Sequence, residues 1–247
     1  DGYGQLASDT LASYGVDLSH LIVDPAIQTG ITVSMSAKDN SDRAMVTYLG
    51  AINALRAEEI SPALFEKTRH IHVGSFFLQS ALRPGLADLF RAAHRAGVTT
   101  SLDAGWDDTG VWDYGLHDVL KETDVFLPNE LEAAAITGKK DVAGAAKTLS
   151  EWCRICTVKC GGDGAVSASA GQVYRAATYA APVRDTTGAG DSFNAGFLYA
   201  FLAGKSIEEA LCYGNACGSL SVARLGGASS CPKLHEAEAV IRNGRVE

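Results

Sequence analysis

A glycine-rich turn runs directly into a helical pattern between residues 184 and 197, RDTTGAGDSFNAGF. Gly188, Ala189 and Gly190 occupy the turn, and Asp191 follows at once. Backbone N–H groups that begin a helix have no partner within it and lie at the positive end of its dipole, so they can bind an anion. If that anion is a phosphoryl group in transfer, these amides would stabilise its charge while Asp191 accepts a proton from the acceptor hydroxyl. A role for Asp191 as an N-cap, worth about 1 kcal/mol, accounts for the pattern equally well.

Three further segments place polar residues where chemistry could occur. In LPNELEAAAITG, Asn129 and Glu132 have the spacing of a capping box, and alone they favour that structural role. Lys159 precedes a glycine-rich turn in TVKCGGDGA, and Asp103 follows a strand pattern in SLDAGWDDTGVW. Taken singly, each of these signals is weak.

Strands and helices alternate through most of the chain, which predicts an α/β fold with a mostly parallel sheet and helices on both faces. Ligands of such sheets bind beyond the carboxyl ends of the strands, where the segments described above fall. The expected strands are 70–74, 98–103, 124–128 and 155–159, followed by a hairpin over 165–179. The expected helices are 81–97, 113–123, 129–138, 141–152, 191–204 and 206–226, with a capping box at Ser206 and Glu209.

The N-terminal part of the chain has a different pattern. A first helix is expected near the start, and two alternating segments around the polar turn KDNSD predict a β-hairpin, with Ile31, Val33 and Met35 on one face. The whole chain, residues 1–247, is expected to form one main domain, with this hairpin attached to the α/β body.

Composition excludes several classes of protein. The chain has 247 residues, is 47% hydrophobic and carries a formal net charge of -8. No run of Lys and Arg could neutralise a phosphate backbone, and no apolar run is long enough to span a membrane, so neither nucleic acid nor a membrane is an expected partner. We expect a cytoplasmic protein. The six cysteines, including Cys153 and Cys156, are expected to be core thiols, and His70 and His72 to be packing residues rather than metal ligands.

The segment DTTGAGDSFNAGF closely resembles the C-terminal signature of the ribokinase-like, or pfkB, family of carbohydrate kinases. The resemblance implies a three-layer ribokinase-like fold and an ATP-dependent transfer of phosphate to a hydroxyl of a small sugar. It also implies that Asp191 is the catalytic base and that residues 188–190 form the anion hole. LPNELE resembles the N-x-x-E element of the family, in which Asn129 approaches the ATP phosphates and Glu132 helps to hold Mg2+, mostly through water.

Two more segments fit the same family in the right order. TVKCGGDGA resembles its nucleotide loop, which would place Lys159, Gly161 and Gly164 beside the phosphates and ribose. NACGSLSVARLGGASSCP resembles the wall of the adenine pocket, with Gly214 and Asn215. In many relatives this segment also joins the loop after Asp185 to bind a monovalent cation such as K+ through carbonyl groups. The candidates here are Asp185, Thr187, Arg224 and Gly226.

The resemblance also assigns the hairpin at 31–49, whereas Asp103 is a candidate because it follows a strand at the edge where a ligand should lie. The hairpin resembles part of the lid that covers the sugar, excludes water and often makes a dimer contact, so a homodimer through the lid is expected. Asp103 would touch the substrate or a magnesium-bound water. A plain surface hairpin is the alternative for residues 31–49.

The first residues of the chain do not identify the substrate. DGYG resembles the end of the G-D-D-x-x-G stretch of the family, so we expect a preceding segment that carries the first strand, a sugar-binding Asp and half of the lid. Two alternatives to a sugar kinase therefore stay open. One is a nucleoside kinase of the same family, and the other is a non-catalytic protein that binds a nucleotide.

Overall fold

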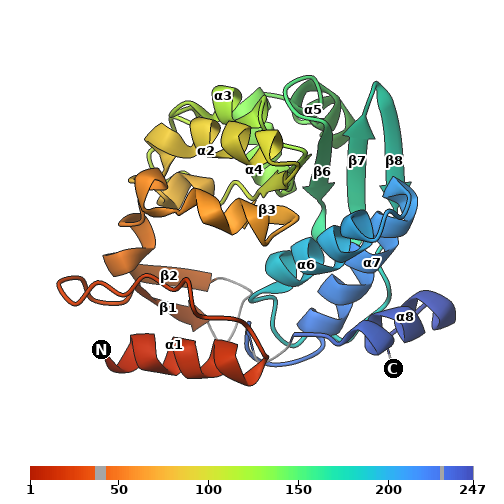
Figure 1. The fold of residues 1–247 in the computed structure, drawn as a ribbon. Coiled ribbons are helices and arrows are strands. Elements are labelled where there is room, and N and C mark those ends of the chain that lie inside the picture. The colour runs from red at the N-terminus through yellow and green to blue at the C-terminus, as the bar shows by residue number, and fades with distance from the viewer. Residues whose placement is uncertain (37–42, 229–230, 247) are drawn as a thin grey trace. The chain divides into compact units, whose positions relative to one another are not determined.

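A computed structural model of the chain describes residues 1–36, 43–228 and 231–246 (Figure 1). The chain divides into two compact units, one formed by Asp1–Ser61 with Leu78–Leu86 and the other by Pro62–Phe77 with Ala87–Glu247. The α-helices are α1 (Gly2–Ser13), α2 (Arg83–Arg95), α3 (Leu116–Leu120), α4 (Glu130–Thr137), α5 (Val142–Leu149), α6 (Ala189–Leu202), α7 (Ile207–Val222) and α8 (Leu234–Asn243). Short 3-10 turns are formed by Gly50–Asn53, Ala57–Glu59, Pro62–Glu66, Phe76–Leu78 and Gly161–Asp163.

The larger unit is built on a six-stranded sheet with the strand order β3-β4-β5-β6-β7-β8. The strands are β3 (His70–Val73), β4 (Thr99–Leu102), β5 (Val125–Phe126), β6 (Ile155–Lys159), β7 (Ala165–Ser169) and β8 (Gln172–Ala176). Strands β3 to β6 pair in parallel, whereas β6, β7 and β8 pair antiparallel. The predicted α/β fold class, every strand predicted for this unit and the hairpin over 165–179 are therefore confirmed.

Helices cover both faces of this sheet, and successive residues of its strands β6 and β7 are buried on both sides (Figure 1). On one face, Phe193 and Phe197 of α6 and Leu211 of α7 form a buried cluster with Ile155 and Ala165 of the strands. On the other face, α5 packs against β6 and β7. Successive residues of β6 point to opposite faces, so Lys159 lies on the same face as Ile155, under α6.

Local signals set most helix boundaries. The capping box at Ser206 and Glu209 is present at the start of α7. Helix α3 is shorter than predicted, because Gly115 has a φ of 82° and ends the preceding turn before the helix begins. Helix α8 was not predicted, although Leu234, Ala237 and Ile241 recur at helical spacing. Its buried residues pack against α7.

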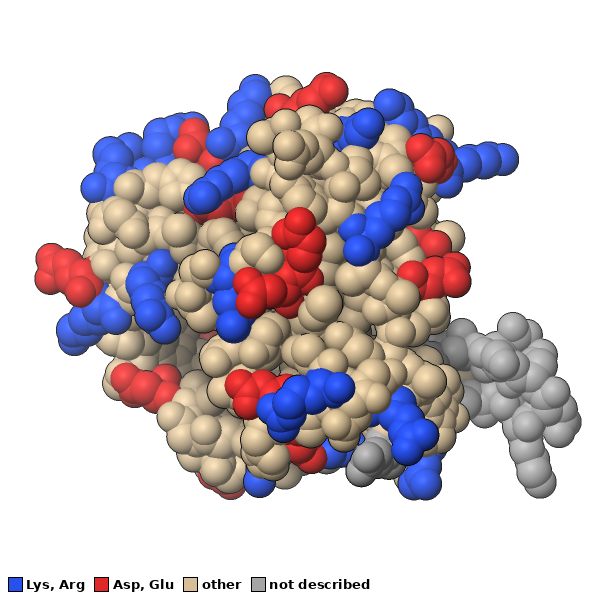
Figure 2. Space-filling model, turned by 90° about the vertical axis from the view of Figure 1, so that its right-hand side faces the viewer, with Lys and Arg blue, Asp and Glu red and all other residues tan. Residues whose placement is uncertain are grey.

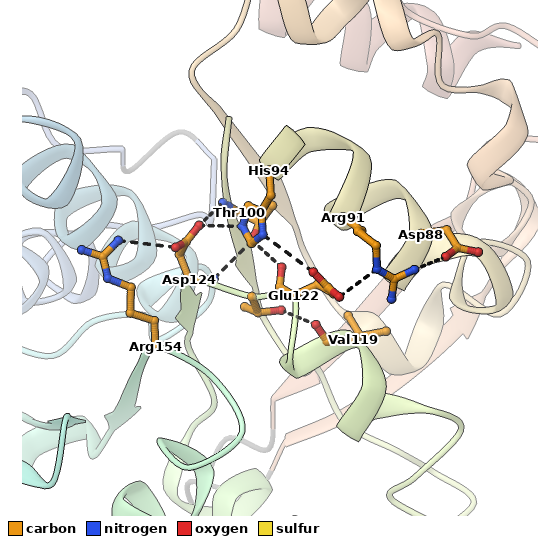
Figure 3. Close-up of polar contacts among 9 residues, drawn as sticks. Asp88, Arg91, His94, Thr100, Val119, Glu122, Asp124 and Arg154 are labelled. Carbon is orange, nitrogen blue, oxygen red and sulfur yellow. Dashed lines mark hydrogen bonds and ion pairs between the residues drawn. The ribbon is translucent and has the colours of Figure 1, made fainter. Parts of the chain in front are cut away.

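A polar network joins α2 to the amino ends of β4 and β5 (Figure 3). The Asp124 carboxylate accepts hydrogen bonds from the Thr100 backbone N–H at 2.9 Å and from His94 Nε2 at 3.0 Å, and it pairs with Arg154 at 3.5 Å. Glu122 continues the network to Arg91, whose Nε donates to it at 2.9 Å. The network lies at the edge of the sheet opposite the carboxyl ends of its strands, so it stabilises the fold away from the predicted site.

The smaller unit contains α1 and a two-stranded sheet of β1 (Ile31–Ser36) and β2 (Arg43–Tyr48). Ile31 faces Tyr48 and Val33 faces Val46 in antiparallel register, so these apolar side chains share one face of the hairpin. The predicted hairpin is confirmed, although its turn lies outside the described residues.

Acidic and basic side chains are interspersed on the face shown in Figure 2. No continuous basic surface of the kind that binds nucleic acid occurs on that face. Among the described helices, none combines the length and apolar character that a membrane span requires.

Candidate active site

The glycine turn adopts a conformation that only glycine accepts easily. Gly188 is the N-cap of α6 and has a φ of 74°, and a Cβ at this position would lie 2.9 Å from Gly227 Cα. Because α6 begins at Ala189, Asp191 is the third residue of the helix, in its first turn. The alternative role of Asp191 as the N-cap is therefore wrong. The left-handed turn at Gly188 directs the chain into the helix three residues before the carboxylate.

Asp191 presents an exposed carboxylate at the positive end of α6. Within the described part of the chain it accepts no hydrogen bond, which leaves both oxygens available to an acceptor hydroxyl. Protein atoms packed around it and the charge of Asp103 raise the pKa of this carboxyl, whereas Lys159 and His72 lower it. A carboxylate with a raised pKa is a stronger base, as proton abstraction requires.

Lys159 lies beneath the glycine turn and is paired with Asp103. Its Nζ donates to Asp103 Oδ2 at 2.6 Å and to Asn194 Oδ1 at 3.2 Å. Burial alone would raise the pKa of the Asp103 carboxyl, but the Lys159 charge, together with hydrogen bonds from Lys159, Asn194 and Gly105, holds it below its ordinary value. Asp103 is therefore a buried anion with a matched cation.

Asn129 and Glu132 form the predicted capping box at the start of α4. The Asn129 side chain accepts from the Glu132 N–H at 2.9 Å, and Glu132 Oε2 accepts from the Asn129 N–H at 2.8 Å. Burial raises the pKa of Glu132. The Lys159 N–H donates to the Pro128 carbonyl at 2.9 Å, which fixes this helix start beside the carboxyl end of β6. Glu132 Oε1 has no partner in the described part of the chain, so it can take a water of a bound cation.

A pocket of about 400 Å³ opens beside the glycine turn. Six of the predicted nucleotide and anion-hole residues line it, namely Lys159, Gly161, Gly164, Ala189, Gly190 and Asn215. The rest of the lining consists of Gly162, Thr178–Ala181, Val183, Thr186, Phe193, Gly218, Ser219 and Val222. Gly164 has a φ of 89°, and its Cβ would lie 2.1 Å from the Ala176 carbonyl. Backbone therefore approaches backbone at this end of the pocket.

Two predicted adenine-wall residues behave differently from each other. The buried Asn215 lines the pocket and its amide donates to the carbonyls of Ala176 and Ala177 at 3.0 and 3.2 Å. Gly214 is not in the lining. A Cβ there would lie 2.8 Å from the Phe193 ring, so this glycine lets α7 pack closely on α6.

Three of the four predicted cation-site residues are brought together. Asp185 Oδ1 accepts from the Thr187 N–H at 2.9 Å, and Asp185 Oδ2 accepts from the Gly226 N–H at 2.9 Å. The Arg224 guanidinium pairs with Glu236 of α8, and the role of its backbone carbonyl stays a prediction. The carboxylate thus joins the two loops that would supply carbonyl ligands. In the described residues, no group of three or more His, Cys, Asp and Glu side chains is placed to hold a metal ion.

A sequence model of the pfkB family of carbohydrate kinases matches residues 1–234. The chain belongs to this family. It is 34% identical over 230 residues to an ATP-dependent ribose-1-phosphate kinase of Halopiger xanaduensis, and the match covers 93% of this chain and 74% of that one. It is 26% identical over 258 residues to a 5-dehydro-2-deoxygluconokinase of Halalkalibacterium halodurans, over 98% of this chain and 77% of the relative. The chain is thus a carbohydrate kinase of the pfkB and ribokinase group.

Solved structures of the family share the fold. An E. coli protein described as a Ribokinase II candidate, solved in complex with ATP and Mg2+, superposes with a TM-score of 0.87 at 26% identity, over 98% of this chain and 80% of that one. A ribokinase of Arabidopsis thaliana, complexed with ribose and ATP, superposes with a TM-score of 0.74 at 27% identity, over 87% and 70% of the two chains. The resemblance drawn from the sequence motifs is therefore confirmed.

Two residues of this pfkB kinase have neighbours that the motifs did not reveal. Asn194 lies within the family signature but was assigned no role. Asn194 lies three residues after Asp191, so both side chains are on one helix face. This spacing is the sequence signal that could have identified Asn194 as a site residue. His72 was assigned to packing, yet its Nδ1 lies 2.7 Å from Ser101 Oγ, and the charges of Asp103, Lys159 and Asp191 influence its pKa. Burial lowers the pKa of His72.

Proposed function

We propose that this pfkB kinase transfers the γ-phosphate of ATP to a hydroxyl of a small sugar, with Asp191 as the base. The observation that carries the proposal is the arrangement around the glycine turn. Ala189 and Gly190 line the nucleotide pocket, whereas Gly188 and Asp191 line a second cavity of about 510 Å³. The phosphate donor and the acceptor can therefore approach the turn from different sides.

In the proposed reaction, Asp191 takes the proton of the acceptor hydroxyl as its oxygen attacks the γ-phosphorus. The oxygen–phosphorus bond to ADP breaks, and the amides of residues 188–190 donate hydrogen bonds to the phosphoryl oxygens. Glu132 would hold Mg2+ through a water, and the ion would offset the negative charge of the phosphates. This arrangement fits the buried Glu132 carboxylate, which has one oxygen in the capping box and one without a partner among the described residues.

A panel of acceptors tests the proposal and its alternatives. The full-length gene product is assayed for ADP release with ribose, ribose-1-phosphate, 5-dehydro-2-deoxygluconate and adenosine. We expect saturable turnover with a sugar or a sugar phosphate. Turnover with adenosine alone would show a nucleoside kinase, and ATP binding without turnover on any acceptor would favour a non-catalytic nucleotide-binding protein.

Asp191→Asn tests the base assignment. We expect kcat to fall by about three orders of magnitude or more, because the amide cannot accept the proton, while the Kd for ATP stays within about twofold. Asp118→Asn, an exposed aspartate of α3, serves as the matched control and should retain wild-type turnover. Wild-type kcat in the Asp191 variant would refute the assignment.

The hairpin, the cation and the location of the protein complete the proposal. The apolar face of β1 and β2 supports a lid and a homodimer contact through residues 31–49, since Val33 and Val46 are 55% and 61% exposed there. Asp185 is proposed to hold Thr187 and Gly226 so that nearby carbonyls can bind K+. The cytoplasm, where ATP is abundant, is the proposed compartment, and residues 1–247 are proposed to act as one functional domain.

A further inference from the structure

Three side chains from distant parts of the larger unit form a closed polar triangle. Asp103 follows β4, Lys159 ends β6 and Asn194 lies in α6. Lys159 Nζ donates to both partners, and Asn194 Nδ2 donates to Asp103 Oδ2 at 2.7 Å. The side chains of Asp103 and Lys159 are only 14% and 13% exposed, and Asn194 is 3% exposed. The group is therefore part of the interior and not a surface ion pair.

Both oxygens of Asp103 are engaged within the protein. Oδ2 accepts from Lys159 and Asn194, and Oδ1 accepts from the Gly105 N–H at 3.1 Å. Breaking a buried pair of this kind leaves a charge without compensation, which is costly. The carboxylate is thus committed to holding its neighbours.

The ammonium that Asp103 and Asn194 hold lies against the glycine turn. A Cβ on Gly190 would lie 3.6 Å from Lys159 Nζ, and both residues line the nucleotide pocket. An ammonium has three N–H groups, and the described residues accept two of them. The third is available to a ligand in that pocket.

We propose that Asp103 and Asn194 are positioning residues that hold the Lys159 ammonium under Gly190, so that its third N–H binds the phosphate being transferred. The inference rests on the proposed function. A lysine side chain is long and flexible, and two fixed acceptors remove the entropy cost of ordering it during each turnover. The charge of Asp103 also keeps the buried ammonium from repelling bound Mg2+ as strongly as a lone cation would.

The surroundings of Asp191 give the triangle a measurable signature. Burial raises the pKa of Asp191, and among the charged groups that act on it, Asp103 raises this pKa while Lys159 and His72 lower it. Removing the Asp103 charge should therefore move the acidic limb of the pH profile of kcat to lower pH. Removing Lys159 should move it to higher pH.

The test compares Asp103→Asn, Lys159→Met and Asn194→Ala in the full-length protein. We expect Lys159→Met to lower kcat about 100-fold and to weaken ATP binding about tenfold, because a phosphate contact is lost. Asp103→Asn and Asn194→Ala should each lower kcat about tenfold with little change in KM for ATP. The acidic limbs of the Asp103 and Lys159 variants should shift in opposite directions, while that of Asn194→Ala stays within error of wild type.

Asp118→Asn is the control, since it removes a carboxylate from an exposed Asp118–Lys121 pair and should change neither kcat nor the pH profile. Unshifted or equally shifted acidic limbs in the Asp103 and Lys159 variants, or wild-type ATP affinity in Lys159→Met, would overturn the inference. If Asp103→Asn does not fold, Asn194→Ala carries the positioning test, and wild-type kcat in that variant contradicts it. If the wild-type protein shows no turnover on any acceptor, the proposed function fails, whereas ATP affinity still decides the role of Lys159.

Discussion

The buried carboxylate of Glu132 can combine its capping role with the proposed metal role. One oxygen completes the capping box with Asn129, and the other has no partner among the described residues. A capping role and a metal role are therefore compatible, although the motif alone favoured only the first. Asp191 likewise contributes its charge to the first turn of α6, while its oxygens stay available for the proposed acceptor hydroxyl.

Glu132→Gln separates these two roles at the residue scale. The amide oxygen can still accept the Asn129 N–H, so the melting temperature should change by only a few degrees. Loss of the negative charge should raise the Mg2+ concentration needed for half-maximal turnover about tenfold or more. Titration of kcat with Mg2+ measures the effect, and Glu130→Gln, an exposed neighbour in the same helical turn, is the control. An unchanged Mg2+ requirement in Glu132→Gln would exclude the metal role.

Gly188→Ala tests the need for a left-handed turn at the anion hole. The substitution combines an unfavourable φ with a Cβ placed 2.9 Å from Gly227 Cα. We expect the free energy of unfolding to fall by about 1–3 kcal/mol and kcat to fall by at least tenfold, because the amides that follow must shift.

Gly204→Ala is the matched variant for this prediction. Gly204 follows the other end of α6 with a φ of 71°, and no atom lies within 4 Å of its would-be Cβ. It should lose about 1 kcal/mol of stability and retain wild-type kcat. Equal losses of activity in the two variants would show that strain alone, and not the position of the amides, affects turnover.

At the scale of elements, the network around Asp124 joins α2, β4 and the residue before β6 (Figure 3). Asp124 is 13% exposed and accepts from a backbone N–H, so Asp124→Asn should lower the free energy of unfolding by about 1–3 kcal/mol. Urea denaturation with an unchanged m-value would measure the loss. Asp88→Asn, at the exposed end of the same network, should cost less than about 0.5 kcal/mol. Equal losses in the two variants would contradict a special role for the buried carboxylate.

The apolar face of the hairpin bears on the scale of the whole molecule. If this face forms the proposed contact between two copies, Val46→Lys should convert a dimer to a monomer. The substitution places a charge within the apolar face that Val46 shares with Val33. Size-exclusion chromatography with light scattering measures the mass over a range of concentrations. Thr47→Lys, on the opposite face of the same strand, should leave the dimer intact. A monomeric wild-type protein at every concentration would refute the contact.

Much of the fold could be predicted from the chain because its local signals agree with one another. The strands of the larger unit, the capping boxes at Asn129 and Ser206 and the hairpin turn at Gly171 are set by residues close in sequence. Helix α8 and the short α3 were less accessible. Helix α8 depends on packing against α7, and the short length of α3 depends on the left-handed conformation of Gly115.

The sequence by itself determined the family, the order of strands and helices, and the identity of the glycine turn with its following aspartate. These are carried by contiguous motifs and by periodicities of two and 3.6 residues. Only the tertiary structure decided which charges meet. Lys159 lies 56 residues from Asp103, and Asn194 lies 91 residues from it. They come together because parallel pairing aligns the carboxyl ends of β4 and β6 and α6 packs across the same face, and no short segment encodes that convergence.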